Sequence, residues 1–205
     1  MKKKHLAITL SKLIPHPHLN VHLEQYATEG DVASNWIFAI ADKFDFVDSN
    51  VVDLGSGNGI LGIGAYYAGA SRITLVETDT EANEVAQSNV DNLEFKDRFT
   101  LLNSKISDVQ IDWKGIDLVI SNPPWGYQRE KADREFIEIG MKNNVAEIHI
   151  LHSSKATHLE KIGKEYGYDS EVILQGSFRL PAIYYHHTKS SEFTEFSAWR
   201  FFKQP

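Results

Sequence analysis

The residues best suited to chemistry are Asn122-Pro123-Pro124-Trp125, which follow the apolar run 116–120. The Asn122 side chain offers a carbonyl acceptor and an amide donor. The two prolines fix φ and remove backbone donors, so the turn is stiff and the carbonyl of Pro123 can face a ligand. Trp125 supplies a flat surface on which a heteroaromatic ring can stack. The motif predicts a clamp for a planar group that carries an NH2, and the alternative is a strand-capping turn with Trp125 as a core anchor.

Such a clamp could activate an aromatic amine for methyl transfer. The lone pair of an exocyclic amine is delocalised into its ring, and two acceptors, on Asn122 and Pro123, can turn it toward a methyl donor. A sulfonium donor is already activated, so the protein supplies alignment and electrostatics, and a dedicated general base is not required. We therefore assign catalysis to none of the nine histidines. His152 follows a strand and is open to a structural or an RNA-contacting role.

A second motif predicts a cofactor site. The short apolar strand 50–54 is followed by a glycine-rich turn and a helical run that begins at Ile60. Ile60 stands where the third glycine of a dinucleotide fingerprint would fall, which favours a cofactor without a pyrophosphate, such as S-adenosylmethionine. An ordinary βα turn and an NAD-type site are the alternatives. The cofactor-binding candidates here are Asp53, Gly55, Gly57, Asn58, Gly59 and Ile60.

An acidic residue follows at the expected distance. The strand 72–77 ends at Glu77, and a carboxylate at this separation from the glycines commonly accepts hydrogen bonds from a ribose diol. Asp79 competes for this role, and an ordinary solvated carboxylate is the alternative for Glu77. We favour Glu77 because it is the first residue beyond the apolar run.

Length and composition indicate one domain, 1–205, with a helical extension and cofactor lid at 1–49 and an α/β core at 50–205. The absence of cysteine excludes disulfides and zinc–thiolate sites within the chain and suits a reducing cytoplasm. No metal site is predicted. No apolar segment has the length needed to span a bilayer. The net charge of −7 argues against a broad nucleic-acid-coating surface, so any RNA contact must be local.

The periodicity predicts alternating strands and helices, hence a mostly parallel sheet with helices on both faces and ligands at the carboxyl ends of the strands. The glycine turn and the Asn122 motif then share one crevice. A helix at 31–44 is expected to be capped by Thr28 or Asp31. The last two strands are expected to form an antiparallel hairpin at one sheet edge, and strands 72–77 and 98–103 to lie at the other. The remaining elements are expected at 2–14, 59–68, 80–91, 116–121, 132–142, 145–151, 155–166, 170–178 and 193–202.

Several blocks together resemble the archaeal and eukaryotic methyltransferase-like protein 5 family of small-subunit rRNA adenine methyltransferases. The similarity runs over nearly the whole chain. Its departures from the family pattern are Ala27 for proline, Trp125 for phenylalanine and Asn103-Ser104 for an acidic residue that contacts the cofactor adenine. The blocks are Leu23–Thr28, Asp53–Leu61, Asn122–Trp125, Leu151–Lys155, and Phe178–Ala182 followed by Tyr184.

The resemblance implies a Rossmann-like class I S-adenosylmethionine-dependent methyltransferase fold. It implies that Gln25, Tyr26 and Thr28 form a lid over the cofactor, for which the residues alone also allow a helix-capping loop. It places Ser104 near the adenine of the cofactor. The related eukaryotic enzymes work with a small zinc-binding activator that pairs with a sheet edge. We expect a comparable heterodimer through the edge formed by strands 72–77 and 98–103, with a monomer or homodimer as the alternative.

The leading function is therefore methylation of an adenine exocyclic amine in RNA, with S-adenosylmethionine as donor. A protein glutamine amide methyltransferase is the first alternative, because a glutamine amide also presents a planar NH2. A non-catalytic cofactor-binding partner of another enzyme is the second. Residues near the Asn122 turn and in one later segment have compositions suited to RNA contact, with a solvated helix start and an edge-covering loop as alternatives; they are Tyr127, Arg129, Lys131, Arg134 and Phe178–Lys189.

Overall fold

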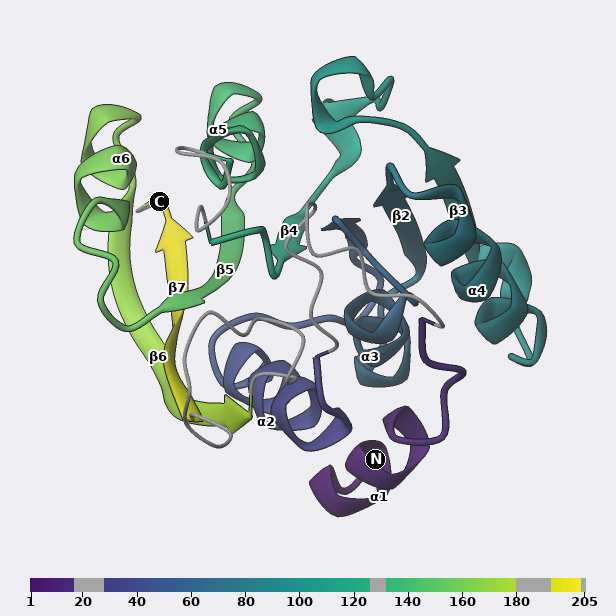
Figure 1. Cartoon of the computed structure of the whole chain (residues 1–205). Coiled ribbons are helices and arrows are strands. Elements are labelled where there is room, and N and C mark those ends of the chain that lie inside the picture. Colours follow the sequence, from purple (N-terminus) through teal and green to yellow (C-terminus); the bar gives the residue numbers. More distant parts are fainter. Residues whose placement is uncertain (17–27, 126–131, 180–192, 204–205) are drawn as a thin grey trace.

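The computed structural model describes residues 1–16, 28–125, 132–179 and 193–203, with backbone only at 178–179 (Figure 1). These residues form a seven-stranded sheet in the order β3-β2-β1-β4-β5-β7-β6. The strands are β1 (Asn50–Leu54), β2 (Arg72–Glu77), β3 (Phe99–Asn103), β4 (Leu118–Ser121), β5 (Glu147–Ser153), β6 (Asp169–Arg179) and β7 (Phe193–Phe202).

The first five strands are parallel, and β7 runs antiparallel between β5 and β6. The expected C-terminal hairpin at one edge is confirmed, and so is the expected position of β3 at the other edge of the described sheet. Because β1 to β5 are parallel, their carboxyl ends meet at one edge of the sheet.

Helices cover both faces of the sheet, each above its own apolar cluster (Figure 1). The side chains of Val51 and Val52, consecutive on β1, belong to opposite clusters, as the two-residue period of a strand requires. On the Val51 face lie α1 (Lys3–Leu10), α2 (Gly30–Ala41), α3 (Ile60–Ala68) and α4 (Thr80–Asp91); on the other lie α5 (Arg134–Lys142) and α6 (Leu159–Glu165). Three short 3₁₀ helices are Lys96–Arg98, Ile106–Asp108 and Trp113–Gly115.

The first helix is shorter than the predicted 2–14, because the residues after it bind elsewhere. The Ile14 N–H donates to Asn89 Oδ1 (2.8 Å), and the Ile14 carbonyl accepts from Asn58 Nδ2 (3.0 Å) and Asn89 Nδ2 (3.1 Å). These bonds tie the N-terminal segment to α4 and to the glycine turn after β1. The extension is therefore attached directly to the loop that was predicted to hold the cofactor.

The predicted cap of α2 is wrong. The N-cap residue is Glu29, in an extended conformation and without a side-chain capping bond to the described chain, and Asp31 lies inside the first turn. Thr28 lies one residue earlier, and its hydroxyl bonds a distant side chain instead. Among the described helices, none is both long and apolar enough to cross a membrane.

Candidate active site

The glycine turn between β1 and α3 is held by backbone hydrogen bonds. Gly55, Gly57 and Gly59 have positive φ of 68°, 55° and 84°, which favour glycine. The N–H groups of Gly55 and Ser56 donate to the Val76 carbonyl at 2.8 and 3.0 Å. A Cβ built on Gly57 would meet no atom of the described chain within 4 Å. Among the described residues, the backbone at Gly57 therefore borders space that a ligand can use.

Glu77 lies beside this turn at the carboxyl end of β2. Its carboxylate accepts from the N–H of Gly57 (Oε2, 2.9 Å) and from the N–H of Asp79 (Oε1, 2.9 Å). Burial, at 6 % exposure, raises the pKa of Glu77 even though backbone N–H groups stabilise the charged form. Two carboxylate oxygens offer about four lone-pair sites, so the group can also accept from a ligand hydroxyl. Asp79 caps α4 by accepting from the N–H groups of Glu81 and Ala82 at 3.0 and 3.3 Å.

Asp53 is fully buried, and its Oδ2 accepts from the N–H of Gly62 at 2.9 Å. This bond attaches the first turn of α3 to β1 and so stabilises the glycine turn that connects them. Burial raises the pKa of Asp53 to about 7, with Glu77 adding a like charge nearby. Its Oδ1 has no hydrogen-bond partner in the described ranges. The contact that the structure gives Asp53 is structural.

The side chains of Asn58 and Ser104 also form hydrogen bonds within the protein. The Asn58 amide donates to Ile14, and the Ser104 hydroxyl donates to the Lys105 carbonyl at 3.0 Å. The adjacent Asn103 donates through Nδ2 to the Glu77 carbonyl at 2.9 Å, which joins the ends of β3 and β2. A cofactor contact of Asn58, of Ile60 at the start of α3, or of Ser104 stays a prediction.

The Asn122 turn begins next to the glycine turn, because β4 pairs with β1. Ser121 Oγ donates to the Leu54 carbonyl at 2.7 Å, so the residues that follow both strands are neighbours. Asn122 Nδ2 donates to Thr28 Oγ1 at 3.1 Å. The other side-chain atom, Asn122 Oδ1, is buried and accepts no hydrogen bond from the described residues. An oriented acceptor therefore lies at the end of β4.

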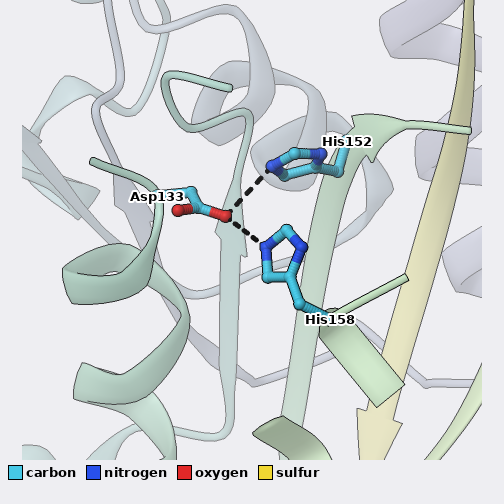
Figure 2. Close-up of side chains that lie close together, drawn as sticks. All are labelled: Asp133, His152 and His158. Carbon is cyan, nitrogen blue, oxygen red and sulfur yellow. Dashed lines mark hydrogen bonds and ion pairs between the residues drawn. The ribbon is translucent and has the colours of Figure 1, made fainter. Parts of the chain in front are cut away.

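Trp125 is 7 % exposed and stacks on His152, with ring centroids 5.7 Å apart and planes 16° from parallel. His152 Nε2 lies 3.1 Å from Asp133 Oδ2, and His158 Nε2 lies 2.6 Å from the same oxygen (Figure 2). Burial alone would raise the pKa of Asp133, but hydrogen bonds and charge from the two histidines outweigh it and keep this pKa below its usual value. Sequence reasoning singled out His152 and missed Asp133 and His158, for which no local pattern gave a signal.

Other predicted positions lie outside the described residues. These include the lid residues Gln25 and Tyr26. Of the predicted RNA contacts, Arg134 is described, and its guanidinium is already paired with Glu138 (Nε–Oε1, 2.5 Å). The remaining candidates outside the described ranges, wholly or for their side chains, are Tyr127, Arg129, Lys131 and Phe178–Lys189.

The sheet order and the two turns define a class I methyltransferase fold. The family model described as "Methyltransferase small domain" matches residues 27–157, and the chain belongs to this family. A protein of Methanocaldococcus jannaschii, "Uncharacterized protein MJ0284", is 32% identical over 198 residues, which are 92% of this chain and 89% of that protein.

Two further relatives bear on activity. The Danio rerio "rRNA N(6)-adenosine-methyltransferase METTL5" is 28% identical over 195 residues, or 93% of this chain and 94% of that protein. The crystal structure of PH1948 from Pyrococcus horikoshii, a proposed RNA methyltransferase, superposes with a TM-score of 0.86 and 33% identity over 99% of this chain and 97% of that one. The expected resemblance to the methyltransferase-like protein 5 family is confirmed, as is the expected fold class.

Proposed function

We propose that this protein transfers a methyl group from S-adenosylmethionine to the exocyclic amine of an adenine in RNA, in particular small-subunit rRNA. One observation carries the proposal. Asn122 Oδ1 is a buried acceptor without a partner in the described chain. The bond from Asn122 Nδ2 to Thr28 orients this amide, and the pairing of β4 with β1 places it next to the glycine turn. A buried acceptor of this kind is costly unless a ligand supplies the donor, and an amine N–H is such a donor.

The glycine turn and Glu77 form the proposed donor half of the site. The open space at Gly57 lets a ligand approach the backbone, and the Glu77 carboxylate is in position to accept from ribose hydroxyls. S-adenosylmethionine, when bound there, supplies an activated methyl group. Further proposed cofactor contacts are Gly55 and Gly59, which belong to the same turn, and Thr28, which bonds the Asn122 side chain.

The turn after β4 forms the proposed acceptor half. Asn122 Oδ1 and the Pro123 carbonyl accept from the two N–H groups of the adenine amine and aim its lone pair at the methyl carbon. Pro124 stiffens the turn, and Trp125 stacks on the base. The nitrogen–carbon bond forms as the carbon–sulfur bond breaks, and the amine then releases a proton to water. No side chain has to act as a general base.

RNA as the substrate class is supported by the Danio rerio relative, which is named for rRNA adenosine methylation. The net charge of −7 means that phosphate contacts must come from local patches or from a second component.

Two measurements test this function. Titration calorimetry is expected to give micromolar affinity for S-adenosylmethionine, about −7 to −8 kcal/mol. Incubation with the cofactor and small-subunit rRNA is expected to yield N6-methyladenosine by mass spectrometry. A glutamine-containing protein substrate that is methylated while RNA is not would favour the alternative acceptor. Tighter binding of NAD than of S-adenosylmethionine would contradict the assignment altogether.

We further propose a cytoplasmic location and a small zinc-binding partner that adds a strand beside β3. The absence of cysteine suits a reducing compartment. β3 is the outermost strand of the described sheet on its side, and an open edge can pair with another chain. Co-purification with mass spectrometry tests the partner. Thr100→Lys on β3 is expected to release it, whereas Val172→Lys on β6, at the other edge, is not; equal capture by both variants would contradict docking at β3.

A further inference from the structure

Three chain segments bring Asp133, His152 and His158 together, and His152 stacks on the Trp125 ring. Asp133 precedes α5, His152 lies near the end of β5 and His158 precedes α6 (Figure 2). Asp133 and His152 are 5 % and 3 % exposed, whereas the His158 side chain is 47 % exposed. The two buried members therefore form a fixed pair, and the third closes the cluster from the solvent side.

The distances in this cluster favour hydrogen bonds over metal ligation. Two ligand atoms around a tetrahedral zinc ion, each about 2.0–2.1 Å from the metal, lie about 3.3 Å apart. His158 Nε2 and Asp133 Oδ2 are 2.6 Å apart, which is too close for two ligands of one zinc ion and fits a short hydrogen bond to a carboxylate. The separation of 3.1 Å from His152 Nε2 to the same oxygen is also an ordinary hydrogen-bond length.

The hydrogen bond to Asp133 fixes the orientation of the His152 ring. Nε2 bonds the carboxylate, so a neutral His152 carries its proton on Nε2. The opposite nitrogen, Nδ1, is buried without a hydrogen-bond partner in the part of the chain that is described. Asp133 is thus the polar contact that prevents rotation of this imidazole.

The fixed imidazole in turn stacks on the Trp125 indole; the two ring centroids are 5.7 Å apart and the planes are nearly parallel. Because Trp125 is 7 % exposed, a base that stacks on it must displace what covers it. During that exchange the indole keeps its orientation only if its other contacts hold. A stacked ring that cannot rotate provides such a contact.

We propose that Asp133 is a positioning residue for base capture: it orients His152, and His152 supports the Trp125 indole against which the target base stacks. The proposal rests on the proposed function, because it assumes that Trp125 receives a base. In this role Asp133 needs no contact with base or cofactor, because it acts through His152.

Kinetics of three variants test this role. Asp133→Ala is expected to lower kcat on RNA by about 10- to 100-fold, the scale of a misplaced reacting group, with S-adenosylmethionine affinity unchanged within about twofold. Asp133→Asn keeps one acceptor oxygen and is expected to recover most of the rate. Glu138→Gln is the matched control, since it disturbs a carboxylate on α5 that pairs with Arg134 and Lys142 without touching His152. A rate loss in Glu138→Gln equal to that of Asp133→Ala would overturn the proposal.

A double-mutant cycle tests whether Asp133 works through His152. In a His152→Ala background, Asp133→Ala is expected to cause no further loss of rate, because the ring it orients is gone. Losses that multiply would show that Asp133 acts by another route and would overturn the proposal.

Two measurements on the free protein separate this proposal from the proposed function. The emission of Trp125, taken as wild type minus Trp125→Phe, is expected to change in Asp133→Ala and to stay unchanged in Glu138→Gln, whether or not RNA is methylated. The reverse pattern contradicts the support of the indole by Asp133 and His152. Titration with Zn²⁺ alone is expected to give no stoichiometric binding; 1:1 binding that His158→Ala abolishes would replace the hydrogen-bonded cluster with a metal site.

Discussion

The two halves of the candidate site are held together by different kinds of hydrogen bond. On the β1–β2 side, the contacts join backbone N–H groups to carboxylates and carbonyls, as in Gly57 to Glu77 and Gly62 to Asp53. On the β4–β5 side, side chains contact side chains, as in Asn122 to Thr28 and Asp133 to His152. The first half is therefore sensitive to backbone conformation and the second to the loss of individual functional groups. This difference gives each half its own kind of diagnostic mutation.

The largest expected effect is on the side-chain half. Asn122→Ala should lower kcat on RNA by about 10²- to 10⁴-fold, because it removes the acceptor that aligns the amine, and should leave S-adenosylmethionine affinity nearly intact. Asn103→Ala is the matched control, since its amide joins β3 to β2 and has no proposed part in alignment. Unchanged turnover in Asn122→Ala would refute the clamp.

The next effect concerns the buried carboxylate under the glycine turn. The pKa of Asp53 is about 7 when folded and near its ordinary value of 3.8 when unfolded. The folded state thus holds the extra proton between these pH values, and stability falls as pH rises through this window, by about 4 kcal/mol in full. Asp53→Asn keeps an acceptor for Gly62 and should remove this fall. Denaturant unfolding of both proteins from pH 4 to 8 measures it; parallel curves would contradict a buried, protonated Asp53.

A smaller effect separates backbone strain from loss of ligand space. Gly57 and Gly167 both have positive φ, 55° and 74°, and a Cβ on either would meet no described atom within 4 Å. Alanine at each should cost about 1–2 kcal/mol of stability. Only Gly57→Ala should also weaken S-adenosylmethionine binding, by about tenfold or more, because only Gly57 borders the candidate site. Calorimetry decides, and equal affinities in the two variants would place the cofactor elsewhere.

The smallest effect tests the contact that orients the clamp. Thr28→Val removes the hydroxyl that accepts from Asn122 Nδ2 and keeps the shape of the side chain. The loss of one hydrogen bond, about 1 kcal/mol, should slow single-turnover methylation by about fivefold. Thr100→Val, on the outermost strand β3, serves as the control. An unchanged rate in Thr28→Val would mean that Asn122 is oriented without Thr28.

The same difference between backbone contacts and side-chain contacts explains which features could be predicted from the sequence. The glycine turn and the Asn122 motif were found because each is a local pattern at the end of an apolar strand. The cap of α2 was predicted wrongly because the partner of Thr28 is 94 residues away. Asp133 and His158 were missed because they lie 25 residues apart, with β5 between them in the chain, and no sequence spacing predicts that they come into contact. Some helix ends differ from the prediction for the same reason. One example is the segment after α1, in which the Ile14 N–H donates to Asn89 instead of continuing the helix.

The position of β7 has a consequence for the order of folding during synthesis. β7 follows β6 in the chain but lies between β6 and β5 in the sheet. β1 to β4 can therefore pair with one another while later residues are still being added, but β5 lacks one neighbour until Phe193–Phe202 has left the ribosome. His152 lies near the end of β5, opposite Ser197 of β7. The cofactor side of the sheet can thus form early on the nascent chain, and the surface that supports Trp125 is completed last.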